Sequence, residues 1–153
     1  GQGKDKYDNV RIGLNSRLDT IQAVVLLNKL EIFDNEIESR NNIANYYSEK
    51  LNDYVVVPFI EKNNISSWAQ YSILVNNEKE RNSLIQHLNS KKIPTAIFYK
   101  KPFNKLDVYS NLNNNSFYIS DKLSKVILSI PMHPYMKIKE QNLIIDSIIE
   151  HLR

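Results

Sequence analysis

Apolar side chains between residues 19 and 51 recur at steps of three and four, the spacing that places them along one face of an α-helix. Asp19 precedes Gln22 by three residues, an arrangement that resembles a capping box at a helix start. The repeating positions are Leu26, Leu30, Phe33, Ile37, Ala44, Tyr47 and Leu51. This pattern predicts a long helix from Asp19 to Leu51, with room for a bend near Asp34 and Asn35.

The first two turns of this predicted helix, Ile21 to Leu27, are apolar on nearly all sides. A helix of that composition is buried on more than one side. We therefore expect this stretch to lie at a junction between domains or between subunits. Residues 1–18 contain all three glycines and show no apolar period. They predict a connecting segment, residues 1–18, cut from within a longer protein and followed by a domain at residues 19–153.

The rest of the chain alternates short β-type runs with helix-type runs. β-Branched and aromatic residues predict strands at 54–59, 68–75, 95–99 and 126–130, and apolar periods predict helices at 77–90, 117–124 and 139–152. A polar, Asn-rich loop is expected at 100–116. The sequence therefore predicts an α+β domain in which helices, including the long N-terminal one, pack on a small, mostly antiparallel sheet.

Composition limits the kinds of site, location and partner to expect for this protein, but it does not identify a function. The 153 residues include no cysteine, which excludes disulfides and thiolate metal sites. The longest apolar run, Ala23 to Leu27, is too short to span a bilayer, and no secretory signal opens the sequence. We therefore expect a cytoplasmic protein that does not bind membranes. Lys and Arg number 20 against 17 Asp and Glu, with no continuous basic stripe, so nucleic acid is not an expected partner.

Residue chemistry alone does not predict a self-contained active site. The three histidines, His87, His133 and His151, have no metal-ligand spacing, so no metal site is expected. Serine-nucleophile, P-loop and dinucleotide-binding motifs do not occur in the sequence. His133 lies between two prolines, where it forms either a structural turn or the edge of a site. The polar residues 15–17 form either a solvated loop with a helix cap or part of a binding site.

Four stretches of the chain, taken in order, resemble one family of enzymes. They are RIGLNSRLDTIQAVVLLNKLEIFDNEIESRNNIANYY at 11–47, PFIEKNNISSWAQY at 58–71, IPTAIFYKKPFNK at 93–105 and LSIPMHPY at 128–135. Together they resemble the C-terminal part of nucleotide-sugar aminotransferases of the DegT/DnrJ/EryC/StrS group. The N-S-R-L-D-x-x-Q-A block is specific to that family, and the resemblance covers nearly the whole chain.

This resemblance implies a fold-type I transaminase that depends on pyridoxal 5'-phosphate, with the present chain as its small C-terminal domain. Such enzymes are usually homodimers with active sites at the subunit interface. The implied reaction transfers an amino group from glutamate to a UDP-linked 3-keto sugar, a 2-acetamido hexuluronate used for lipopolysaccharide or capsule. The family's cofactor-binding lysine lies in the large domain, and no lysine here matches its motif. The chain alone is therefore expected to be inactive.

The resemblance also assigns roles to individual residues. Asn15 corresponds to the asparagine that reaches across the dimer toward the cofactor phosphate. Arg17 corresponds to the arginine beside it, whose guanidinium suits a substrate carboxylate or phosphate. Tyr99 matches the tyrosine of a His-Tyr pair that lines the sugar-nucleotide pocket, whereas Phe98 stands at the histidine position. No catalytic residue and no metal ligand is implied in this chain.

Two hypotheses therefore compete. The chain is either a piece of a sugar aminotransferase or a stand-alone interaction or binding module of the same fold, which would use the face left by the lost domain. An in-frame extension of the coding sequence upstream of Gly1 that carries the lysine motif would decide for the enzyme.

Overall fold

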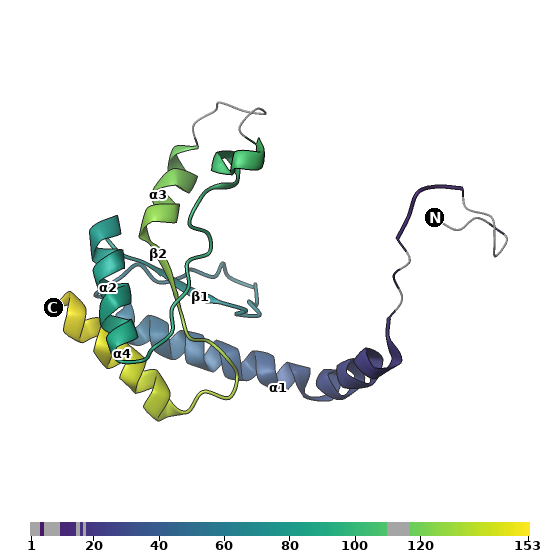
Figure 1. Cartoon of the computed structure of the whole chain (residues 1–153). Coiled ribbons are helices and arrows are strands. Elements are labelled where there is room, and N and C mark those ends of the chain that lie inside the picture. Colours follow the sequence, from purple (N-terminus) through teal and green to yellow (C-terminus); the bar gives the residue numbers. More distant parts are fainter. Residues whose placement is uncertain (1–3, 5–9, 15, 17, 110–116) are drawn as a thin grey trace. The chain divides into compact units, whose positions relative to one another are not determined.

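The computed structural model describes residue 4, residues 10–14, residue 16, residues 18–109 and residues 117–153 (Figure 1). Its elements are α1 (Thr20–Leu51), β1 (Tyr71–Leu74), α2 (Glu78–Ser90), α3 (Tyr118–Val126), β2 (Ile127–Ile130) and α4 (Ile138–Leu152), with short 3₁₀ helices at Phe103–Lys105 and Asp107–Tyr109. The chain divides into two compact units, residues 1–34 and residues 35–153. The predicted α+β fold class is confirmed, while the domain boundary at residue 18 stays a prediction.

Helix α1 begins where the sequence predicts. The Asp19 carboxylate accepts a hydrogen bond from the backbone N–H of Ile21 at 2.7 Å, and the Asp19 carbonyl accepts from Ala23 at 2.8 Å. These bonds satisfy donors that every helix start leaves free. The helix then continues through Asp34 and Asn35 without a break in its assignment. Among the described residues, no helix combines enough length and apolarity to cross a membrane.

The two halves of α1 have different surroundings. In the second half, Ile43, Ala44, Tyr47 and Leu51 are buried. In the first half, Leu26, Leu30 and Phe33 are 52%, 68% and 49% exposed. The apolar period of α1 therefore continues into a half that is exposed, and the junction between domains or subunits expected at Ile21 to Leu27 stays a prediction. Only the second half belongs to the unit that contains the sheet and the other helices.

Strands β1 and β2 form a two-stranded antiparallel sheet in which Tyr71 lies opposite Ile130 and Leu74 lies opposite Ile127. Along β1, the side chains of Tyr71 and Ile73 are buried and alternate with half-buried ones. This alternation places one face of the strand against the core. Both strands are shorter than the runs predicted from the sequence, but they lie within them.

One segment pairs with each outer edge of this small sheet through a single bridge. Val56 pairs with Leu74, and Ala96 pairs with Ser129, both in antiparallel orientation. The full strands predicted at 54–59 and 95–99 are therefore wrong. A proline two residues after Val56 and another two residues before Ala96 have no N–H to donate, which limits the ladder on either side.

Helices cover the sheet because two strands alone are at best marginally stable in water. The second half of α1 joins α2 and α4 in a single core with β1 and β2, and α2 packs beside α4 (Figure 1). The fully buried apolar side chains of this core include Tyr47, Leu51, Tyr71, Ile73, Leu84, Leu88, Leu128 and Ile148. Buried Arg81 on α2 donates to the Ser124 carbonyl on α3 at 2.7 Å, which ties α3 to the same core.

Helix α2 ends in a Schellman motif that contains no glycine. The N–H of Ile93 donates to the carbonyl of Leu88, and the N–H of Lys92 donates to that of Asn89, both at 2.9 Å. Lys92 therefore adopts a φ of 60°, in the left-handed region where a Cβ atom is unfavourable. Ile93 is buried. The motif thus directs the chain from α2 into the segment that starts at Pro94.

We predict that Lys92→Gly stabilises the protein by about 1 kcal/mol, because glycine adopts a positive φ without the clash of a Cβ atom. Urea denaturation followed by circular dichroism measures the free energy of unfolding. The matched control Asn89→Gly, inside α2, should destabilise by about 0.3 kcal/mol, because glycine favours the helix less than asparagine does. A loss of stability in Lys92→Gly would contradict the argument.

Candidate functional site

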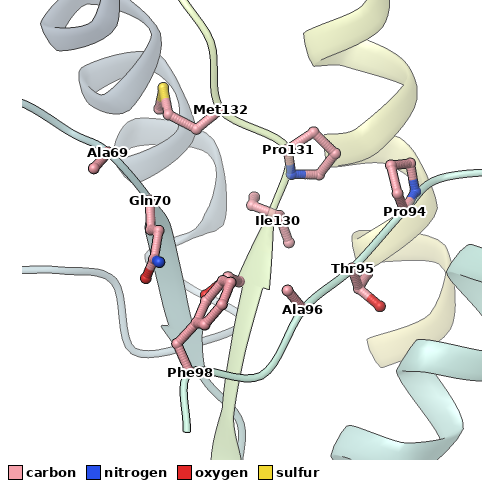
Figure 2. Close-up of a pocket in the computed structure, with 10 residues that line it drawn as sticks. Ala69, Gln70, Pro94, Thr95, Ala96, Phe98, Ile130, Pro131 and Met132 are labelled. Atoms are coloured by element: carbon pink, nitrogen blue, oxygen red, sulfur yellow. The ribbon is translucent and has the colours of Figure 1, made fainter.

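A shallow cavity of about 340 Å³ lies where β1 begins and β2 ends (Figure 2). Three segments that are far apart in sequence line it: residues 69–70, 94–98 and 129–132. The lining side chains are Ala69, Gln70, Pro94, Thr95, Ala96, Phe98, Ser129, Ile130, Pro131 and Met132. Each segment lies within one of the four stretches that resemble the aminotransferase family. The fold therefore brings three of these stretches together at one concave surface.

The first wall, residues 69–70, is positioned by a strained tryptophan. Trp68 has a φ of 47°, which is rare for a bulky side chain. Its indole N–H donates to the Asn41 side-chain oxygen at 2.9 Å, and its carbonyl accepts from the Arg40 guanidinium at 2.8 Å. Strain of this kind persists only where the surroundings hold it. Arg40, the one polar residue on the predicted apolar stripe, thus helps fix the wall that includes Gln70.

The other two walls are also tied to the core by hydrogen bonds. Ala96 and Ser129 exchange backbone hydrogen bonds of 3.1 and 2.8 Å, and the Ser129 hydroxyl bonds to that of Ser72 at 2.7 Å. The Tyr47 hydroxyl donates to the Pro131 carbonyl at 3.1 Å. Burial raises the pKa of Tyr47 well above its usual range, so the phenol remains a neutral donor near neutral pH.

A second, larger groove of about 930 Å³ adjoins the cavity and shares Phe98 with it. It runs between the segment 98–106 and α3, and its lining is mostly apolar. Tyr99 lies in this groove with 75% of its side chain exposed, and its ring is T-shaped to that of Phe98 at 5.9 Å. The exposed residues Lys100 and Lys101 also line the groove. This surface therefore joins aromatic rings to positive charge.

The structure places only part of the site predicted from the sequence. Phe98 lines both the cavity and the groove, whereas Tyr99 lines only the groove, and the sugar-binding role of Tyr99 stays a prediction. Asn15 and Arg17 lie outside the described residues, so their roles stay predictions. Sequence reasoning missed Gln70 and Trp68. Both residues lie in SSWAQY, the end of the stretch at 58–71 that resembles the family, and this resemblance is the signal that could have found them.

None of the three histidines is among the residues that line this cavity, although His133 directly follows the lining residue Met132. His87 on α2 and His151 near the end of α4 approach within 5.0 Å between ring centroids. The His133 ring nitrogen accepts from the Tyr135 N–H at 3.3 Å within a turn. In the part of the chain that the structure describes, no group of three or more histidines and carboxylates could hold a metal ion.

The cavity walls do not make a complete site for pyridoxal phosphate. That cofactor needs a lysine for its covalent anchor and a charged partner for its ring nitrogen. Neither a lysine nor a carboxylate is among the ten lining residues. The ten residues that line this cavity therefore offer no covalent anchor for that cofactor.

Comparisons with known proteins agree with the resemblance. Residues 1–149 match the DegT/DnrJ/EryC1/StrS aminotransferase family. The chain is 41% identical to a UDP-2-acetamido-2-deoxy-3-oxo-D-glucuronate aminotransferase of Pseudomonas aeruginosa over 88% of its own length and 37% of the relative's. It is 32% identical to a dTDP-3-amino-3,6-dideoxy-alpha-D-galactopyranose transaminase of Aneurinibacillus thermoaerophilus, over 94% of this chain and 39% of that protein.

A solved structure supports the same relationship. The crystal structure of an aminotransferase of this family from Brucella abortus superimposes with a TM-score of 0.92 at 45% identity, over 98% of this chain and 40% of that one. The chain thus spans about two fifths of the length of the relatives that it matches.

We predict that Asn41→Ala destabilises the protein by about 1–3 kcal/mol, because it leaves the buried indole N–H of Trp68 without a partner. Trp68 is the only tryptophan, so its fluorescence reports this site directly and should shift to longer wavelength. The exposed control Asn89→Ala should change the free energy of unfolding by less than about 0.5 kcal/mol. An unshifted spectrum with unchanged stability in Asn41→Ala would show that α1 does not hold this wall.

Proposed function

Because the chain belongs to the DegT/DnrJ/EryC1/StrS aminotransferase family, which it matches over residues 1–149, we propose that it is the C-terminal part of a sugar aminotransferase dependent on pyridoxal phosphate. The proposed reaction moves an amino group from glutamate to a UDP-linked 3-keto sugar, a 2-acetamido hexuluronate. The observation that carries the substrate assignment is the 41% identity to the Pseudomonas aeruginosa enzyme over 88% of the chain. The meeting of three family stretches at one cavity supports it.

In this proposal, the chain binds and orients the sugar. Pyridoxal phosphate supplies the electron sink for amino transfer when it is bound. The apolar walls beside Phe98 and Pro131 exclude water from the substrate, and the exposed Tyr99 hydroxyl is available for a hydrogen bond to it. Arg17 pairs with an anionic group of the substrate, and Asn15 contacts the cofactor phosphate across a homodimer interface. We assign no proton transfer to the described residues.

The exposed apolar half of α1 fits a place within a larger protein. Its residues Ile21, Val24, Val25, Leu27 and Leu30 are 52–76% exposed, and exposed apolar residues gathered in this way mark interaction surfaces. We propose that the rest of the aminotransferase covers it. A stand-alone binding module would present the same face to another partner. Sequencing the DNA upstream of Gly1 separates the two, because only the enzyme requires an in-frame domain with the cofactor-binding lysine.

We predict that the 153-residue chain, purified alone, has no transaminase activity because it lacks that lysine. Incubation with pyridoxal phosphate and reduction with borohydride should give no stoichiometric label on one defined lysine by peptide mass spectrometry. Random partial labelling of exposed lysines is the expected background. One fully labelled site would overturn this part of the proposal.

In the longer enzyme, Arg17→Ala should weaken the reaction with the nucleotide sugar by roughly 10- to 150-fold, because a charge-assisted hydrogen bond contributes ~1.5–3 kcal/mol. The half-reaction with glutamate should change less. Arg17→Lys should restore only part of the loss, since an ammonium cannot form the bidentate fork. Stopped-flow kinetics of each half-reaction make the comparison, and equal losses in both halves would instead assign Arg17 to the cofactor or to the dimer interface.

A further inference from the structure

We propose that the cavity beside Phe98 binds the N-acyl group of the sugar, with Gln70 as its hydrogen-bonding partner. This inference rests on the proposed function and adds a subsite that determines which sugars are accepted. The cavity volume of about 340 Å³ is at the lower end of the ~300–1,000 Å³ of ligand pockets, which suits part of a ligand rather than a whole nucleotide sugar.

The lining fits an acylamino group because it combines apolar walls with one primary amide. Ala69, Ala96, Pro131 and Met132 offer carbon surface to a methyl group. Gln70 carries both an acceptor oxygen and a donor N–H₂, which are the complements of the N–H and C=O of a secondary amide. Among the described residues, the Gln70 side chain has no hydrogen-bond partner of its own, and Figure 2 shows it on the cavity wall near Phe98.

The other polar groups of the lining narrow the choice of ligand. The remaining polar side chains of the lining are neutral hydroxyls, that of Thr95 and that of Ser129, which shares a hydrogen bond of 2.7 Å with Ser72. No charged side chain is among the ten lining residues, and desolvating an anion without a partner is costly. A carboxylate or a phosphate is therefore a poor occupant, whereas a neutral amide with a methyl group matches both kinds of surface.

The adjoining groove offers a place for the anionic part of the same substrate. Phe98 lines both the cavity and the groove, and exposed Lys100 and Lys101 line the groove, where Lys101 lies 3.9 Å from the carboxylate of Asp107. With the acyl group in the cavity, the diphosphate of a nucleotide sugar would extend past Tyr99 toward these lysines. Four relatives carry an acetamido or N-acetyl sugar in their names, one of Pseudomonas aeruginosa, two of Campylobacter jejuni and one of Acidithiobacillus ferrooxidans. This agrees with the proposed occupant.

The test is an NMR titration of the ¹⁵N-labelled chain with UDP-N-acetylglucosamine, UDP-glucose and UDP, each up to about 10 mM, ten times a dissociation constant of 1 mM. We expect saturable shifts at the backbone amides of residues 69–70, 96–98 and 132 with the acetamido sugar. UDP-glucose should bind roughly 5- to 20-fold more weakly, because it lacks the amide hydrogen bond and the buried methyl group. UDP alone should shift residues 99–101 and leave the cavity unchanged.

Variants make the assignment specific. Gln70→Ala should remove most of the preference for the acetamido sugar, and Gln70→Glu should remove it as well, because a carboxylate lacks the donor. The control Gln86→Ala, on the exposed side of α2, should retain the preference. Equal binding of the two sugars, shifts that avoid the cavity, or no shift at the highest concentration would each overturn the inference. A second assay distinguishes failure of this inference from failure of the proposed function. It measures amino transfer by the longer protein to sugars with and without the acetamido group. Equal transfer to both sugars would overturn the inference and leave the proposed function standing.

Discussion

The site depends on the buried contact between Trp68 and helix α1. The indole N–H donates to Asn41 and the backbone carbonyl accepts from Arg40, so a residue in an unfavourable backbone region is held from two directions. The Trp68 ring also lies 5.5 Å from that of Tyr71, the first residue of β1. One helix therefore fixes both the start of the sheet and the wall that carries Gln70, and these two features together define the cavity.

The remaining walls follow the same principle, in which polar groups of the core hold short irregular segments. Tyr47, six residues after Asn41 on α1, donates to the Pro131 carbonyl at one end of the cavity. Ser129 pairs with Ala96 at the side of the cavity. Prolines and a left-handed Lys92 keep these segments out of regular strands. A binding surface built this way stays concave, because the backbone turns away from the sheet instead of extending it.

Sequence periodicity correctly predicted the helices, which depend mainly on residues close together in the chain. The predicted starts and ends of α1 and α2 differ from the observed ones by one residue at most. Each helix has an apolar period and an N-terminal cap, Asp19 for α1 and, for α2, Asn77, whose side chain accepts from the Glu80 N–H at 2.9 Å. The strands expected around Val56 and Ala96 were reduced to single bridges, because pairing depends on tertiary neighbours. The period also could not tell which half of α1 this chain buries. The role proposed for Gln70 could not be predicted from the sequence, because it depends on three segments meeting in space, and the role of Tyr99 was proposed only through the family resemblance.

The central claim is that the walls held by α1 form the sugar site of an aminotransferase. Hydrogen–deuterium exchange of the longer protein, encoded with its upstream sequence and loaded with pyridoxal phosphate, tests this most directly when compared with and without UDP-N-acetylglucosamine. The account predicts that peptides covering residues 68–71, 94–99 and 129–132 gain protection together on addition of the sugar. Protection confined to other segments, with these three unchanged, would contradict it.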